Sequence, residues 1–143
     1  MSAGRRIARA SKFIHIGKHA AAAPIVLIWG GETTVTLGGA AGRGGRNQEA
    51  ALVAAVEIDG RPNIAIATFA TDGVDGPTDA AGAIATGETC GRARQIGLDP
   101  GAVLANHDSH TFFDGLERAG FPHLIRTGPT GTNVNDIALA LVY

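Results

Sequence analysis

The residues best suited to chemistry lie in three polar, glycine-containing stretches, of which the first is Gly38–Glu49, GGAAGRGGRNQE. Five of its twelve residues are glycine, and Arg43 and Arg46 stand among them. Glycine lets the backbone adopt positive φ and lets a ligand approach the main chain. The unpaired N–H groups at a helix N-terminus attract anions, and arginine offers fork-shaped donors for phosphate or carboxylate. The stretch therefore suits an anion site, although a glycine-rich surface turn with solvent-facing arginines has the same composition.

The second stretch, residues 70–79, reads ATDGVDGPTD and carries three closely spaced aspartates. Carboxylates held on turns are the usual ligands of Mg²⁺ or Ca²⁺, so Asp72 and Asp75 are candidate metal ligands. The full EF-hand pattern is missing, which excludes a calcium hand. The alternative is that these aspartates close Asx turns or cap helices. Asp79 fits that alternative best, because the small residues of Ala80–Thr86 could begin a helix.

The third stretch, residues 127–136, reads TGPTGTNVND and is rich in hydrogen-bonding side chains, among them Thr130, Asn133 and Asp136. A plain hairpin connection could have this composition. Three polar glycine loops, each beside an apolar run, nevertheless favour one shared site in so short a chain. We therefore expect Arg46, Asp72 and Asn133 to meet at one edge of a single sheet.

Apolar runs next to these stretches predict the elements that position them. The predicted strands are Ile25–Trp29, Thr33–Leu37, Ile64–Phe69 and residues 124–126 and 137–142, and the predicted helices cover about residues 47–56, 88–96, 100–106 and 109–119. Asn47 is the expected N-cap of the first helix. The uninterrupted apolar run Ile25–Trp29 is typical of a strand buried on both faces, as in parallel sheets. The prediction is a single small three-layer α/β domain with a mixed, mostly parallel sheet and glycine-rich loops at one edge.

Composition narrows the functional classes. A chain of 143 residues fits one domain, and 21 glycines, about twice the usual share, imply many tight turns. The net charge of −1 argues against nucleic-acid binding. The single cysteine, Cys90, excludes an internal disulfide and fits a cytoplasmic protein. The sequence has no run of about 20 apolar residues, so it predicts no membrane-spanning helix.

Taken together, the three stretches resemble the C-terminal domain, called MOFRL, of the bacterial-type glycerate 2-kinases, a family often labelled hydroxypyruvate reductase. The likeness covers Ile25–Tyr143 and rests on GGETTVTLGGAAGRGGRNQEAAL, ATDGVDGPTDAAGA and RTGPTGTNVNDIALAL. Residues 25–143 would then be the MOFRL-like domain, and residues 1–24 a tail or the remnant helix of a preceding domain.

The resemblance implies an enzyme that phosphorylates D-glycerate at the 2-hydroxyl with ATP and Mg²⁺, in a cleft between two domains. The expected partners are glycerate and the larger N-terminal kinase domain, which is missing from this sequence, so the chain by itself is expected to be inactive. An apolar face left uncovered by that domain would promote a homo-oligomer. The alternatives are a hydroxypyruvate reductase, for which we find no nicotinamide-binding fingerprint, and a non-catalytic anion-binding module.

Carried over residue by residue, the resemblance implies a site that draws on all three stretches. Arg46 and Asp72 would be catalytic, and Asp72 with Asp75 would hold the metal. The substrate- and phosphate-binding residues would be Arg43, Gly44, Gly45, Asn47, Glu49, Thr130, Asn133 and Asp136. These roles agree with phosphoryl transfer, which depends mainly on positioning and on charge stabilisation.

Overall fold

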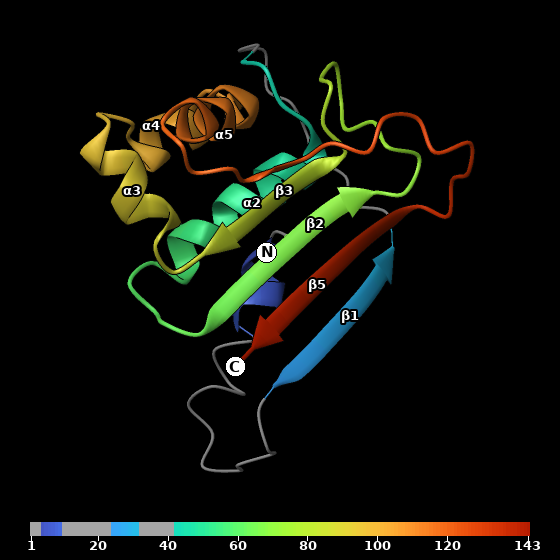
Figure 1. The fold of residues 1–143 in the computed structure, drawn as a ribbon, viewed down its shortest axis with the longest axis horizontal. Coiled ribbons are helices and arrows are strands. Elements are labelled where there is room, and N and C mark those ends of the chain that lie inside the picture. The colour runs from blue at the N-terminus through green and yellow to red at the C-terminus, as the bar shows by residue number, and fades with distance from the viewer. Residues whose placement is uncertain (1–3, 10–23, 32–41) are drawn as a thin grey trace.

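A five-stranded antiparallel sheet organises the part of the chain that the computed structural model describes, namely residues 4–9, 24–31 and 42–143 (Figure 1). The strand order is β1-β5-β2-β3-β4, and each neighbouring pair runs antiparallel. The strands are β1 (Ile25–Gly31), β2 (Ile64–Ala70), β3 (Gly82–Thr86), β4 (Leu124–Ile125) and β5 (Asp136–Val142). The labelled helices are α2 (Arg46–Glu57), α3 (Thr89–Gln95), α4 (Pro100–Ala105) and α5 (Ser109–Arg118), and residues 4–9 are also helical.

The small α/β domain is confirmed, but the prediction of a mostly parallel sheet is wrong. Its basis was the apolar run in β1, interpreted as burial on both faces. In the structure Leu27 and Trp29 pack toward the helices, whereas Val26 and Ile28 on the opposite face are 56% and 69% exposed. In Figure 1, α2 lies behind the sheet, whereas α3, α4 and α5 lie beside its β3 edge. The core clusters join these helices to one face of the sheet, so among the described residues one face is covered where three layers were predicted. The run is continuous because the open face is apolar as well.

The core surrounds α2 on the helix-covered face of the sheet, in two main clusters. One joins α2 and the central strands to residues 4–9, and the other joins α2 to α3 and α5. The first contains Ile7, Ala8, Ala54, Ile58, Ile64, Ile66 and Ala140, and the second Ala51, Leu52, Ala83, Ala93, Phe112, Phe113 and Leu116. Helix α2 therefore forms the centre of the domain, and the position of its N-terminus fixes the geometry at one end of the sheet.

The predicted helices match α2, α3, α4 and α5 to within one or two residues, but the helix proposed for Ala80–Thr86 is wrong. Residues 82–86 form β3, which lies between β2 and β4. A Cβ at Gly82 would stand 1.9 Å from the carbonyl oxygen of Thr68, so only glycine allows this close approach. The small side chains serve strand packing here. The predicted strand Thr33–Leu37 lies outside the described residues.

Candidate functional site

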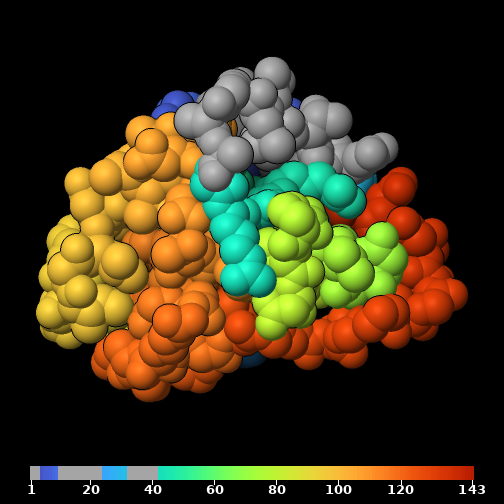
Figure 2. Space-filling model, turned by 90° about the horizontal axis from the view of Figure 1, so that it is seen from above, coloured from blue at the N-terminus to red at the C-terminus, as the bar shows by residue number. Residues whose placement is uncertain are grey.

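The three polar stretches come together at one end of the sheet. Asp136 at the start of β5 pairs with Ala70 at the end of β2, because these two strands are antiparallel. The loop that leaves β2 and the loop that enters β5 are therefore neighbours, and the N-terminus of α2 lies beside both. Figure 2 looks down on this end, where residues 42–48 in cyan lie against residues 71–79 in green, with residues 127–135 in orange-red along the rim. Residues 38–41 of the first stretch lie outside the described residues.

Arg46 and Asp136 form the most closely fitted ion pair of this end. Arg46 is the first residue of α2, and its Nε and Nη2 each lie 2.7 Å from one carboxylate oxygen of Asp136. Asn47 Nδ2 donates to the same carboxylate at 3.0 Å. The Asp136 side chain is 4% exposed, while that of Arg46 is 34% exposed. The bidentate pair therefore fixes the guanidinium and leaves part of it accessible to an anion.

The N-terminus of α2 is closed by a residue from another loop. The N-cap is Gly45, so the prediction that Asn47 would be the cap is wrong; Asn47 is the second helical residue. Asp75 instead accepts from the backbone N–H groups of Asn47 and Gln48 at 3.0 and 2.9 Å, and it is fully buried. A carboxylate here neutralises the positive end of the helix dipole. These two amides already serve a protein carboxylate, which sequence alone does not reveal because 28 residues separate the partners.

Asp72 and the third stretch form one hydrogen-bonded unit at the rim. One carboxylate oxygen of Asp72 accepts from the backbone of Val74 at 3.0 Å, and the other accepts from Asn133 Nδ2 at 3.1 Å. Thr130 donates its backbone N–H to the carbonyl of Asp72 at 3.1 Å and its hydroxyl to the carbonyl of Thr71 at 2.6 Å. These contacts hold the Asp72 carboxylate in one orientation and leave each oxygen with further acceptor capacity.

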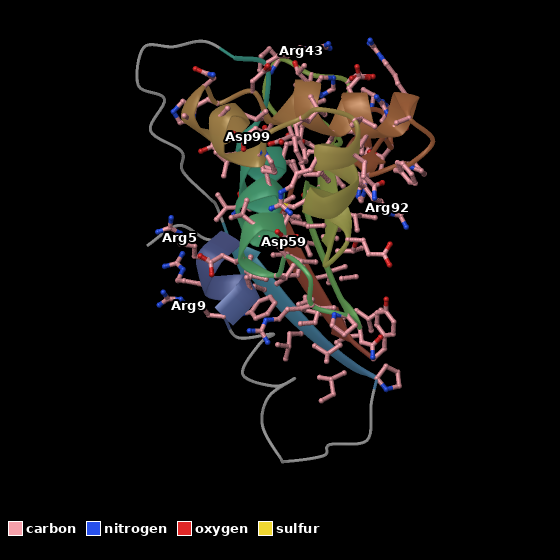
Figure 3. The ribbon with its side chains drawn as sticks, turned by 90° about the vertical axis from the view of Figure 1, so that its left-hand side faces the viewer. Arg5, Arg9, Arg43, Asp59, Arg92 and Asp99 are labelled. Atoms are coloured by element: carbon pink, nitrogen blue, oxygen red, sulfur yellow. The ribbon has the colours of Figure 1, made fainter. Side chains whose placement is uncertain are left out.

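Arg43 stands at this end as well, beside α5 (Figure 3). Its side chain is 55% exposed, and its Nη2 lies 3.8 Å from Asp79 Oδ1. Asp79 also accepts from Arg126 Nε at 2.9 Å, and this hydrogen bond lowers the pKa of the Asp79 carboxyl. Of the two arginines in the first stretch, Arg43 is therefore the more accessible.

The glycines of the first stretch accommodate the protein itself. A Cβ at Gly44 would lie 2.3 Å from Ser109 Oγ, and one at Gly45 would lie 2.3 Å from the carboxylate of Asp75. Their absent side chains let the segment run between the second stretch and the start of α5. Glu49 lies apart from the Arg46–Asp136 pair, since its Oε2 contacts His107 Nδ1 at 2.8 Å.

Two buried residues, Gln48 and His110, take part in the site although the sequence assigned them no role. His110 Nδ1 lies 2.9 Å from Gln48 Oε1, and Gln48 Nε2 donates to Asp75. Burial, with a smaller effect from Arg43, lowers the pKa of His110. No local sequence signal marks either residue, because their partners lie 27 and 62 positions away.

The donor set fits a metal ion at Asp72 better than at Asp75. Among residues 4–9, 24–31 and 42–143, no group of three or more His, Cys, Asp or Glu side chains could hold a metal. Asp75 already accepts four hydrogen bonds, two from Asn47 and two from Gln48. Asp72 carries two. A Mg²⁺ ion that keeps several waters and binds phosphate needs only one or two protein carboxylates.

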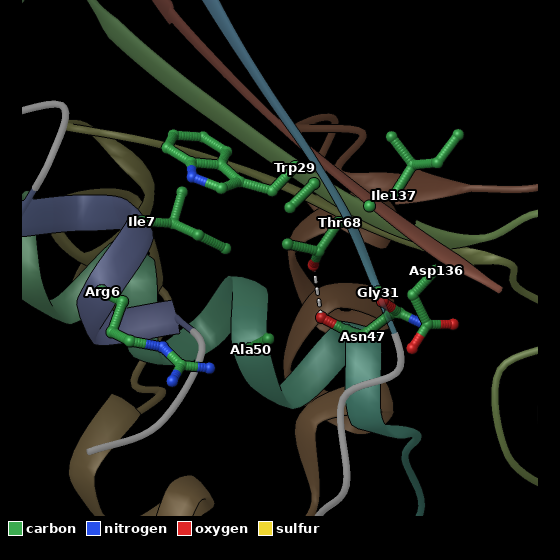
Figure 4. A pocket seen from close by; sticks show the side chains of 11 residues that line it. Arg6, Ile7, Trp29, Gly31, Asn47, Ala50, Thr68, Asp136 and Ile137 are labelled. Carbon is green, nitrogen blue, oxygen red and sulfur yellow. Dashed lines mark hydrogen bonds between the residues drawn. The ribbon is translucent and has the colours of Figure 1, made fainter.

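A cavity of about 290 Å³ lies on the helix side of the sheet, next to the Arg46–Asp136 pair. Figure 4 shows Arg6, Trp29, Asn47, Thr68 and Asp136 along its wall. Thr68 donates its hydroxyl to the carbonyl of Asn47 at 2.6 Å. Asn47 and Asp136 thus connect the cavity to the rim.

Comparison with known proteins identifies the family. Residues 25–136 match the model of the MOFRL family. This chain belongs to the MOFRL family. The MOFRL chain is 50% identical over 119 residues to a glycerate 2-kinase of Pyrococcus horikoshii, covering 83% of this chain and 26% of that protein. It is 47% identical over 122 residues to a putative hydroxypyruvate reductase of Agrobacterium vitis, covering 85% of this chain and 27% of that one.

A solved structure also matches. The crystal structure of glycerate kinase from Thermotoga maritima superposes with a TM-score of 0.87 at 44% identity, covering 98% of the MOFRL chain and 32% of the solved chain. The MOFRL chain thus spans about a quarter to a third of the relatives that it matches. No helix within the described residues is long and apolar enough to cross a membrane.

Proposed function

We propose that this MOFRL chain forms the C-terminal part of an ATP-dependent glycerate 2-kinase, which converts D-glycerate to 2-phosphoglycerate. The observation that carries the proposal is the Arg46 guanidinium, held bidentately by Asp136 at the edge where Asp72 and Asn133 also stand. In this proposal residues 25–143 contribute loops to an active site shared with an N-terminal domain, and residues 1–24 lead in from that domain. The kinase names of the relatives support the same assignment.

The arrangement suits phosphoryl transfer because that reaction depends on orientation and on stabilisation of negative charge. The oxygen of the glycerate 2-hydroxyl forms a bond to the γ-phosphorus of ATP, its proton passes to Asp72, and the bond to the β–γ bridging oxygen breaks to release ADP. Arg46 and Arg43 bind the transferred phosphoryl group or the glycerate carboxylate. Asn133 orients Asp72 through its amide. Asp72 would hold a Mg²⁺ ion, which would supply positive charge to offset that of the phosphates.

A reductase is the second candidate, because one of the relatives bears that name. Such an enzyme would need a dinucleotide site, whose pyrophosphate usually rests on helix N-terminal amides after a glycine-rich turn. In this chain the amides of Asn47 and Gln48 are occupied by the buried Asp75. This geometry favours the kinase. A non-catalytic anion-binding module would keep Arg43 and Arg46 accessible without any turnover.

The test is to replace the matching third of the Thermotoga maritima D-glycerate 2-kinase by this chain and to measure formation of 2-phosphoglycerate. We expect activity, and we expect Arg46→Ala to lower kcat/KM by at least about tenfold. Arg94→Ala is the matched control, since Arg94 is 58% exposed and pairs with Asp59, away from the rim. Wild-type rates in the Arg46 variant would refute the proposal, and NADH consumption with hydroxypyruvate would favour the reductase.

A further inference from the structure

A chain of buried hydrogen bonds leads from helix α5 to the Arg46 guanidinium. It runs through His110, Gln48, Asp75, Asn47 and Asp136, and each step is 3.3 Å or shorter. All five residues are at most 3% exposed. Water therefore competes little with these bonds, and in a low-dielectric interior each one orients the next.

The side-chain amide of Gln48 has a single allowed orientation. Its Nε2 faces three acceptors, namely the carbonyl and a carboxylate oxygen of Asp75 at 3.2 and 3.0 Å, and Thr78 Oγ1 at 3.0 Å. The Thr78 hydroxyl donates its own proton to the Asp75 carbonyl, so it can only accept from Gln48. The amide oxygen of Gln48 must then point at His110.

This orientation fixes the tautomer of His110. Because Gln48 Oε1 is an acceptor, His110 Nδ1 has to carry the proton of their 2.9 Å bond. The other ring nitrogen, Nε2, lies 3.4 Å from Asp79 Oδ1. His110 is thereby a fixed hydrogen-bond donor in the first turn of α5, and its bond to Gln48 connects α5 to the N-terminus of α2.

We propose that His110 and Gln48 are positioning residues that hold Arg46 in its binding geometry without touching the substrate. They orient Asp75, Asp75 fixes the first turn of α2, and that turn sets the direction in which Arg46 leaves the helix. The consequence for activity rests on the kinase function proposed above. The positioning itself is a property of this chain and can be measured without substrate.

The test uses ¹H–¹⁵N NMR on the 143-residue chain and follows hydrogen exchange at Arg46 Nε–H, which is protected while the bond to Asp136 persists. His110→Leu removes the donor at similar volume, and we expect exchange at least about tenfold faster than in the wild type. His110→Asn keeps an N–H near the Nδ1 position, and we expect it to restore exchange to within about twofold. Thr78→Val, at a half-buried position, is the milder variant and should accelerate exchange by about threefold.

Two controls distinguish a local effect at Arg46 from a general loss of stability. Exchange at the backbone N–H of Ile66, in the centre of β2, reports global opening, so only the excess at Arg46 counts. Ile58→Val weakens a core cluster that contains no residue of the buried hydrogen-bond chain, and it should change Arg46 and Ile66 exchange alike. The wild type adds a check that needs no variant: its His110 nitrogen shifts should show the Nδ1–H tautomer.

Wild-type protection of Arg46 in a folded His110→Leu chain would overturn the proposal, as would a failure of His110→Asn to restore it. An Nε2–H tautomer in the wild type would do the same. If His110→Leu does not fold, the Thr78→Val variant provides the test. Unchanged Arg46 exchange in that variant would contradict the proposed positioning of Arg46 by Gln48 and His110. A failed kinase assay leaves this result standing, and a failed exchange test leaves the kinase assay unaffected, so the two proposals fail separately.

Discussion

Asp75 should be far more important for stability than its neighbour Asp72, although both are loop aspartates of the same motif. The carboxylate of Asp75 is 0% exposed and accepts two hydrogen bonds from Asn47 and two from Gln48. Asp75→Asn keeps the volume, but it turns one acceptor oxygen into an NH₂ group that faces donors. Two N–H groups then lose their acceptor inside the protein, and the helix loses its charged cap.

The expected magnitude follows from these losses. A helix cap contributes about 0.5–2 kcal/mol, and a buried donor without a partner costs about 1–3 kcal/mol. Each carboxylate oxygen accepts one backbone N–H, which is the cap bond, and one side-chain N–H, so one cap and one further buried donor are lost. We expect Asp75→Asn to lower the free energy of unfolding by about 2–4 kcal/mol. Asp72→Asn makes the same chemical change in the same loop, where water reaches the side chain, and should cost less than about 1 kcal/mol.

Urea unfolding followed by circular dichroism measures both variants. With a slope of about 2 kcal/mol per M, the Asp75→Asn midpoint should fall by about 1–2 M. The slope itself should stay unchanged, because the same surface is exposed on unfolding. If the two aspartate variants unfold at the same urea concentration, Asp75 is not the buried cap that the hydrogen bonds indicate.

Three further predictions concern ionisation and the open sheet face. Burial lowers the pKa of His110 and of His123 below the ordinary value of 6.5. The unfolded chain therefore binds more protons than the folded chain at acidic pH. The stability that the two neutral histidines contribute is present above about pH 6.5 and is lost as the pH falls through their folded pKa. Urea midpoints should therefore be lower at about pH 5.5 than at about pH 7.5, and equal midpoints would contradict this. Burial raises the pKa of the Cys90 thiol to about 11, so iodoacetamide should alkylate it only as fast as the chain opens, and rapid labelling of the folded protein would argue otherwise. Ile28 is 69% exposed on the open face, so Ile28→Lys should reduce any self-association seen by sedimentation velocity, and undiminished association would exclude this face as its cause.

The position of the site could be predicted from local patterns, but most of its contacts could not. Polar glycine loops beside apolar strands indicated a shared edge, and Arg46, Asp72, Asn133 and Asp136 do lie there. Which group faces which was not predictable. Glu49 contacts His107 instead of the rim, and Asp75 caps a helix that begins 29 residues before it. Such pairings depend on how distant loops are juxtaposed, and no spacing within one segment encodes them.

The prediction of a mostly parallel sheet failed for a related reason. A run such as Ile25–Trp29 shows that a strand is apolar on both faces, yet burial of both faces requires a second layer. Here the described helices cover one face, and Val26 and Ile28 remain exposed on the other. The pattern in the sequence is the same in either case.

By itself, the sequence determined helices α2 to α5, strands β1, β2 and β5, and the family, because periodicity and long motifs are local properties of the chain. Only the tertiary structure decided that the sheet is antiparallel, that Asp75 closes α2, and that Gln48 and His110 stand behind Arg46. Those features depend on contacts between residues 27 to 90 positions apart. Such contacts exist only after the sheet has brought its loops to one edge and removed them from water.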